Sequence, residues 1–216
     1  MEREAFLQKV QAAVRAVRDE LPPESGWQWE PLEEIADDRV ALAARFEQEL
    51  VALGGRVHRV ENVPGAVNTR VVELVRETNA RRVALTRSAQ MLDLQNALES
   101  MNVRVAENPR EFAGCEIGIS GVLCGVAETG SVLLASGEGE ARMATTLPPR
   151  YIAILRASQI VPNFRAALRV VKNLYGAEFP ANLTLVTGPS RTADIELSLT
   201  IGVHGPGQVD VVLVED

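Results

Sequence analysis

The sequence is poor in lysine. Lysine and arginine together number 22 among the 216 residues, and only Lys9 and Lys172 are lysines. Neither lies near the glycine-rich stretches of the chain. A P-loop is therefore excluded, because it needs a lysine beside the glycines that hold its phosphates. A Schiff-base mechanism, which depends on a lysine amine, is disfavoured on the same ground.

Cysteine and histidine are also scarce. The two cysteines, Cys115 and Cys124, form neither a C-x-x-C pair nor the spacing of an iron–sulfur site. We expect both to be buried free thiols. His58 and His204 are the two histidines, which are too few for a zinc site built on histidine. The sequence therefore predicts no metal site and no redox centre on this chain.

Long apolar runs are absent. No unbroken apolar stretch reaches the roughly 18 residues of a membrane span. The charged residues Glu2, Arg3 and Glu4 lead into an amphipathic pattern and not into an apolar segment, which argues against a signal peptide. The net charge of −7, with a pI near 5.1, disfavours a nucleic-acid binder, which normally has a basic face. We expect a cytoplasmic protein with no nucleic-acid partner.

Residues 1–36 are expected to form an extension of the main domain. Apolar residues recur every three or four positions through residues 1–21, which predicts a helix. Residues 22–36 contain several prolines together with Trp27 and Trp29. Such a tryptophan pair more commonly packs a loop against the core of a protein than stacks on a ligand. The alternative to packing on the main domain is packing on a partner subunit, as in a homo-oligomer.

Residues 37–216 are expected to form one α/β domain. A helix from Val40 to Leu53 opens it, capped by Asp37 or Asp38 and ended by two glycines. Short β-rich runs then alternate with helical ones, which predicts an open, mostly parallel sheet with flanking helices. The expected elements are strands at 56–60, 82–86, 103–105, 132–135, 151–155, 183–187 and 209–214, and helices capped by Asn68, capped by Ser88 and begun by Pro162.

A glycine-marked stretch follows the expected strand 183–187. It reads Thr187, Gly188, Pro189, Ser190, Arg191 and Thr192. A turn of small residues directly after a strand exposes backbone N–H groups to an anion. Ser190 can donate to a carboxylate or phosphate, and Arg191 can pair with it. A helix cap with a surface arginine is the alternative, although the alternation from Ile195 to Ile201 favours a strand there.

A second glycine-marked stretch precedes the expected strand 132–135. Glu128, Thr129 and Gly130 form a turn in which the carboxylate can act as nucleophile or general base, or can simply fix the turn. Ser136 and Gly137 begin a loop flexible enough to wrap a phosphate. Glu138 and Glu140 oppose an anion in that loop, and Arg142 offsets them.

Asp194 and His204 complete the set of candidate residues. Asp194 lies two positions before Glu196, a spacing that allows paired-carboxylate chemistry. His204 lies in a Gly-Val-His-Gly-Pro segment that predicts a turn. A lone histidine is more commonly a hydrogen-bonded structural residue than a ligand. We expect all these loops to converge at one end of the sheet and to form a ligand site.

Four segments together resemble the LUD-domain family. They are Ala127–Ser131, Leu147–Pro149, Thr187–Glu196 and Gly202–Pro206. The similarity extends over about residues 35–215 and is strongest to the group typified by lactate-utilisation protein C. It implies a fold similar to that of ribose-phosphate isomerase, glucosamine-phosphate deaminase and the CoA-transferases. That fold is an open α/β sheet, in agreement with the alternation of elements.

The resemblance implies a part in bacterial oxidation of L-lactate to pyruvate. The implied partners are iron–sulfur proteins. Because this chain lacks ferredoxin-type cysteines, the clusters are expected on the partners and no cofactor is expected here. A small carboxylate or phosphate would bind at the glycine stretches, held by Ser190 and Arg191, with Glu128 and Asp194 as candidate catalytic residues. Two alternatives stay open: a stand-alone enzyme of the CoA-transferase or sugar-phosphate-isomerase type that uses Glu128, and a structural assembly subunit without a ligand.

Overall fold

The computed structural model describes residues 4, 5, 7–9, 11, 12, 38–86, 92–106, 108–137, 142–176, 178–193 and 199–215. The chain divides into two compact units, residues 1–36 and 37–216. In the first unit the described residues are helical, and the expected loop with Trp27 and Trp29 lies outside them. Among the described residues, no helix combines the length and the apolar character needed to cross a membrane.

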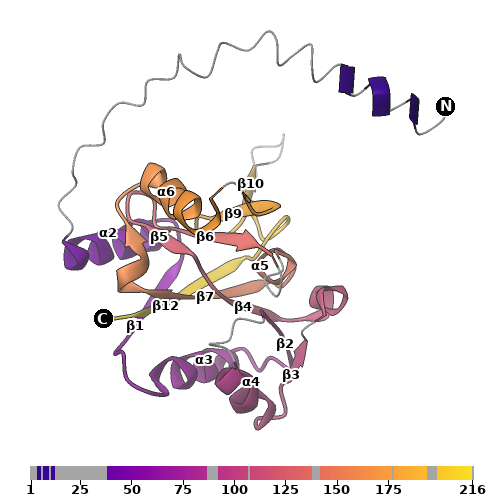
Figure 1. Ribbon diagram of the computed structural model, residues 1–216. Coiled ribbons are helices and arrows are strands. Elements are labelled where there is room, and N and C mark those ends of the chain that lie inside the picture. Colours follow the sequence, from indigo (N-terminus) through magenta and orange to yellow (C-terminus); the bar gives the residue numbers. More distant parts are fainter. Residues whose placement is uncertain are drawn as a thin grey trace. The chain divides into compact units, whose positions relative to one another are not determined.

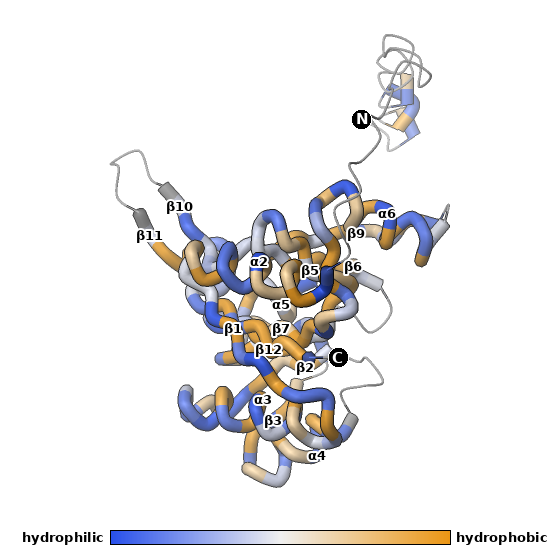
Figure 2. Tube along the Cα trace, turned by 90° about the vertical axis from the view of Figure 1, so that its left-hand side faces the viewer, coloured by the Kyte–Doolittle hydropathy of each residue, from blue (hydrophilic) through white to orange (hydrophobic). Residues whose placement is uncertain are grey.

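A six-stranded, fully parallel sheet forms the centre of the second unit. Its strands, in spatial order, are β1 (Arg56–Val60), β12 (Gln208–Val214), β7 (Arg150–Arg156), β4 (Ile117–Gly121), β2 (Arg82–Leu85) and β3 (Arg104–Ala106). Every residue of β12 after Gln208 is buried. A parallel strand covered on both faces is mostly apolar in sequence, and Figure 2 shows mostly hydrophobic colour around the labels of β7 and β12. The predicted mostly parallel sheet is confirmed.

A second sheet of four strands accompanies the first. Its order is β8 (Ile160–Val161), β5 (Cys124–Val126), β6 (Ser131–Ser136) and β9 (Asn182–Val186). The β5–β6 and β6–β9 pairs are antiparallel, and the β5–β8 pair is parallel. The expectation of one open sheet is therefore incomplete, because β5 and β8 are too short to show a period of two in the sequence.

Helices cover both sheets in layers (Figure 1). The helices α3 (Ala66–Glu77) and α4 (Leu92–Glu99) pack on one face of the parallel sheet. On the other face lie α2 (Arg39–Ala52), which packs between the two sheets, and the short α5 (Met143–Thr146), which packs on β4. The outer face of the second sheet is covered by α6 (Phe164–Tyr175). Smaller elements are two 3₁₀ turns, Pro109–Gly114 and Ala157–Gln159, and the hairpin of β10 (Arg191–Ala193) with β11 (Leu199–Ile201).

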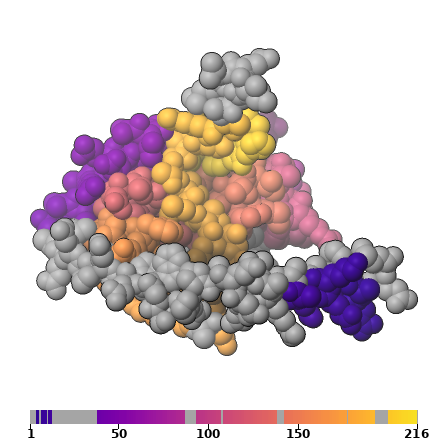
Figure 3. All heavy atoms as spheres, turned by 90° about the horizontal axis from the view of Figure 1, so that it is seen from above, coloured from indigo at the N-terminus to yellow at the C-terminus, as the bar shows by residue number. Residues whose placement is uncertain are grey.

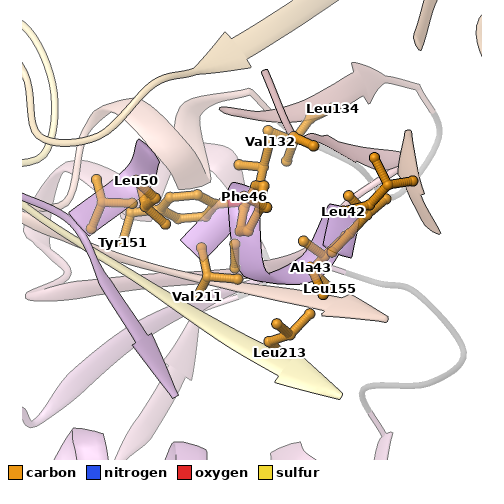
Figure 4. Packing of buried hydrophobic residues seen from close by; sticks show 14 residues of the cluster. Leu42, Ala43, Phe46, Leu50, Val132, Leu134, Tyr151, Leu155, Val211 and Leu213 are labelled. Atoms are coloured by element: carbon orange, nitrogen blue, oxygen red, sulfur yellow. The ribbon is translucent and has the colours of Figure 1, made fainter. Parts of the chain in front are cut away.

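Phe46 of α2 lies at the centre of the core between the sheets. Its side chain is fully buried among residues of β6, β7 and β12, including Val132, Tyr151 and Val211 (Figure 4). Burying such an aromatic side chain contributes about 2–3 kcal/mol. Val40, the first residue of the predicted helix, is 78% exposed. The helix is thus held by one narrow apolar stripe that contacts both sheets.

The helix caps were only partly predicted. Asp38 caps α2, as expected, and accepts hydrogen bonds from two backbone N–H groups. Asn68 was wrong as a cap, because α3 already begins at Ala66, after Gly65 in a left-handed conformation. At α6 the cap is Asn163, whose side chain accepts from Ala166 N–H, and Pro162 lies before the helix. The expected cap at Ser88 is outside the described part of the chain.

Candidate functional site

The two glycine-marked stretches meet at one end of the second sheet. The strands β6 and β9 are antiparallel neighbours, with Val132 opposite Val186, so the turn before β6 and the turn after β9 lie together. Hydroxyls join them: Ser131 Oγ is 2.7 Å from Thr129 Oγ1 and 2.8 Å from Thr187 Oγ1. The stretches therefore converge, but not at an end of the parallel sheet.

Glycines of both stretches pack against the end of α2. Gly130 has φ +61°, and a side chain there would collide with the backbone nitrogen of Leu50. Gly188 has φ +77°, and its Cβ would lie 3.1 Å from Leu53 Cβ. Only glycine combines a left-handed conformation with so close an approach. Gly130 and Gly188 therefore allow the two turns to pack directly against the backbone of α2.

Arg191 also contacts the end of α2. Its Nη2 donates to the carbonyl of Leu53, the C-cap residue of the helix. A cation is favoured at this position, because the last carbonyls of a helix carry partial negative charge. In Figure 3 the purple segment that includes α2 lies beside yellow residues of the C-terminal part of the chain. The guanidinium that was expected to hold an anion is thus engaged with the backbone of a helix.

The neighbouring candidates are held by backbone contacts. Glu128 is exposed, and its N–H donates to the carbonyl of Pro162 (3.0 Å). The N–H of Ser190 donates to the carbonyl of Pro206 (2.8 Å), and its own carbonyl accepts from the N–H of Gly202 (2.9 Å). Pro189 and Thr192 flank this contact and are half-buried. The strand predicted over Ile195–Ile201 lies mostly outside the described residues, as does Asp194. Its described end, Leu199–Ile201, is β11, which pairs with β10 (Arg191–Ala193).

A cavity of about 790 Å³ lies at the amino ends of β7 and β12. Arg142 and His204, candidates from separate stretches, both line it. Its lining comes from α5 and the residues around it, from β9 and from the turn that joins β11 to β12: Arg142, Thr146, Leu147, Pro149, Asn182, Leu183, Thr184, Leu185, Gly202, Val203, His204 and Gly205. Of the other described candidates, none lines this cavity.

The lining favours an anion with an apolar part. Arg142 is the one permanently charged residue among the described residues of the wall, and no described carboxylate faces the cavity. Thr146, Asn182 and Thr184 add polar side chains, and leucines supply apolar surface. An arginine with several convergent polar groups beside apolar side chains is typical of a site for a small carboxylate or phosphate. Glu138 and Glu140 are outside the described residues.

A much smaller cavity, of about 10 Å³, adjoins Arg142. Ser136 and Thr184 line it together with Thr86, whose buried hydroxyl has no hydrogen-bond partner within the described structure. The space holds about one water molecule, which would satisfy that hydroxyl. Ser136 is therefore near Arg142. Gly137, in contrast, is exposed, and a Cβ added to it would meet nothing within 4 Å.

A buried ionic cluster was not foreseen. Asp210 of β12 is fully buried and accepts hydrogen bonds from Arg56 (Nη2, 3.0 Å), Arg150 (Nε, 2.8 Å) and the ring of His58 (2.8 Å). Arg70 Nη2 lies 2.8 Å from the other ring nitrogen of His58. Since arginine can only donate, Nδ1 of His58 accepts from Arg70, and Nε2–H donates to Asp210.

The cluster keeps the Asp210 carboxyl ionised. Burial alone would raise its pKa, but the hydrogen bonds from His58, Arg150 and Arg56 outweigh burial and lower the pKa to about 2. Arg150 also donates to the carbonyl of Leu74 (2.9 Å), so the cluster ties α3 to the sheet. The signal in the sequence was a single aspartate within the apolar run 209–214.

Both cysteines are buried free thiols, as expected. Burial raises the pKa of Cys124 to about 11 and also raises that of Cys115. Within the described structure, no three His, Cys, Asp or Glu side chains are grouped so as to hold a metal ion.

Residues 43–214 match the family model of the LUD domain. Curated relatives are named lactate utilization protein C. The relative from Macrococcus caseolyticus is 38% identical over 113 residues, which are 51% of this chain and 49% of the relative. The relative from Halalkalibacterium halodurans is 40% identical over 103 residues, 47% of this chain and 45% of the relative. In these two alignments the chain spans about half the length of the relative.

A longer alignment exists with lactate utilization protein C of Shouchella clausii. It is 30% identical over 198 residues, which are 88% of this chain and 85% of that relative. Among solved structures, a DUF162 family protein from Deinococcus radiodurans is similar, with a TM-score of 0.61 and 22% identity, over 85% of this chain and 99% of that one. That likeness supports the fold alone.

Proposed function

The chain belongs to the LUD domain family, and from this premise we propose that it is a component of a lactate-utilisation system that binds a small carboxylate in the cavity lined by Arg142 and His204. The observation that carries the proposal is the cavity itself. Two residues from distant segments meet on it, and no described carboxylate lines it. The substrate class follows the names of the relatives.

The lining residues have distinct roles in this proposal. The guanidinium of Arg142 pairs with the carboxylate. Thr184 and Asn182 hydrogen-bond the α-hydroxyl or the keto oxygen, and Leu147 contacts the methyl group. His204, on the opposite loop, adds a further polar contact. A neutral wall with one arginine selects for a singly charged anion.

The redox chemistry is proposed to reside on partner proteins. A ferredoxin-type cluster takes four cysteine thiolates, and the sequence has two cysteines. Both are buried with raised pKa values, which disfavours the thiolate that ligates iron. This chain would then bind the carboxylate while an iron–sulfur partner accepts the electrons.

Ligand binding by the purified chain tests the site. L-lactate or pyruvate at 100 times its dissociation constant should stabilise the protein by about 2.7 kcal/mol, seen as a shift of the thermal transition. Arg142→Ala should abolish the shift. Arg191→Ala is the matched control: it removes a second exposed arginine, lowers stability by about 0.5–1 kcal/mol through the lost contact to α2, and should keep the ligand-induced shift. An equal shift in wild type and Arg142→Ala would refute the site.

Turnover tests the role in the system. With iron–sulfur partner proteins present, lactate-dependent electron transfer should fall at least tenfold in Arg142→Ala. Glu128→Ala should keep its rate, because Glu128 does not line the cavity. A rate that falls in Glu128→Ala and is kept in Arg142→Ala would favour an enzyme that uses Glu128.

A further inference from the structure

The cavity follows the edge of a strand rather than its face. Four consecutive residues of β9, Asn182–Leu185, line it. Side chains of a strand alternate between its two faces, so consecutive residues can border one cavity only where the backbone itself faces it. In the second sheet β9 is the terminal strand, and no described strand pairs with its outer edge.

The pairing register identifies the backbone groups on that edge. Leu133 of β6 turns its carbonyl toward β5, where it accepts from Leu123 N–H at 2.8 Å. In an antiparallel ladder, opposite residues either exchange both hydrogen bonds or none. Leu185 lies opposite Leu133, so its N–H and carbonyl point away from β6. By alternation the same holds for Leu183, and both residues line the cavity.

The size and rim of the cavity suit a ligand longer than lactate. Cavities of about 300–1,000 Å³ hold drug-sized molecules, and this one has about 790 Å³. Apolar side chains at its mouth are unusually exposed: Leu147 is 44% exposed, Leu185 42% and Val203 53%. A three-carbon acid would leave most of this surface uncovered. The one charge on the described wall, Arg142, calls for a negative group on the occupant.

We propose that the free edge of β9 docks an extended segment of a partner protein, which adds a strand through Leu183 and Leu185 and places a carboxylate on Arg142. Strand addition of this kind takes affinity from backbone hydrogen bonds and selectivity from alternate side-chain contacts. The inference rests on the proposed function for the existence of a partner. Because the segment and a small carboxylate use the same guanidinium, they compete for it.

The test uses the full chain and a library of fluorescent hexapeptides with free C-terminal carboxylates. Enriched peptides should alternate apolar residues and bind in fluorescence polarisation. N-methylation at alternate positions, on the side that faces β9, should weaken binding at least tenfold, and N-methylation at the intervening positions should weaken it less than threefold. Failure of the library to yield any binder, or equal effects at all positions, overturns the proposal.

Variants of the chain supply the second readout. Leu185→Pro removes the outward N–H without breaking the β6–β9 ladder, as edge strands tolerate, and should weaken the best peptide at least tenfold. The matched control Leu185→Ala keeps the N–H and should weaken it less than threefold. Equal losses in the two variants contradict strand addition. Thermal melting establishes that both are folded.

The two proposals fail separately. Saturating lactate should displace the peptide from wild type. Peptide binding without any response to lactate or pyruvate would remove the small-carboxylate ligand and leave the docking edge in place. A response to lactate that depends on Arg142, without any peptide binder, would remove the docking edge and keep the small-carboxylate ligand.

Discussion

Asp210 is a fully buried carboxylate at the centre of an ionic cluster. Its carboxylate accepts from Arg56, His58 and Arg150 while fully buried. Removing one partner of such a cluster is costly, because the remaining charges stay buried without compensation. These contacts join β1, β7 and β12 at their amino ends, close to the cavity that begins beside β7.

The pH dependence of stability should report this residue. The pKa of Asp210 is lowered from 3.8 to about 2, so its contribution is complete above pH 3.8 and is lost as the pH falls toward 2. The shift corresponds to roughly 2 kcal/mol. Urea unfolding of wild type and Asp210→Asn at pH 6 should differ by about 3–5 kcal/mol.

The difference should shrink as the pH falls below 4, since wild type then loses the charge that the variant already lacks. Glu61→Gln, at an exposed site, is the control and should change stability by less than about 0.5 kcal/mol. A difference between wild type and Asp210→Asn that is constant from pH 6 to pH 2.5 would contradict the assigned role.

At the scale of elements, α2 contacts both sheets and both glycine-marked stretches. Its apolar stripe fills the space between the sheets, and its last turn receives Gly130, Gly188 and Arg191 from the two glycine-marked stretches. The two glycine-marked stretches, which the sequence suggested as a ligand site, therefore also pack against the end of α2. Their glycines are required by close approach, whatever binds nearby.

A substitution at Gly130 measures that close approach. Gly130→Ala meets both a left-handed backbone and the backbone of Leu50, and should cost at least about 2 kcal/mol of unfolding free energy. Gly65→Ala is the matched control: φ is +83° there, but nothing lies within 4 Å of its Cβ position. It should cost only about 1 kcal/mol, the strain term alone. Equal losses in chemical denaturation would show that packing on α2 does not matter.

At the scale of the molecule, residues 37–216 contain both sheets and their covering helices. The hydrophobic clusters of the described chain draw on these residues. A unit with its own core is expected to fold without the remainder of the chain.

Deletion of residues 1–36 should therefore leave the α/β unit folded. We expect the circular dichroism spectrum to keep its mixed helix and strand signature and the urea transition to stay cooperative. Stability should fall by less than about 1 kcal/mol. The full-length chain, measured in parallel, is the control. A truncated chain that has lost its cooperative transition would show that the extension is part of the core.

Local sequence determined most of the elements of this protein. Apolar runs and their periods predicted β1, β7, β12 and the parallel sheet, and Asp38 marked the start of α2, because these signals depend on neighbours a few positions away. Buried free cysteines followed from their apolar surroundings. The family resemblance came from short motifs that are likewise contiguous in sequence.

The tertiary structure alone decided the second sheet, the cavity and the ionic cluster. Arg191 meets Leu53 across 138 positions, and Arg56 meets Asp210 across 154. Arg142 and His204 share one cavity only because β9 pairs with β6 and the loop before β12 folds back beside α5. No local period encodes such contacts, since they depend on which faces of distant elements pack together.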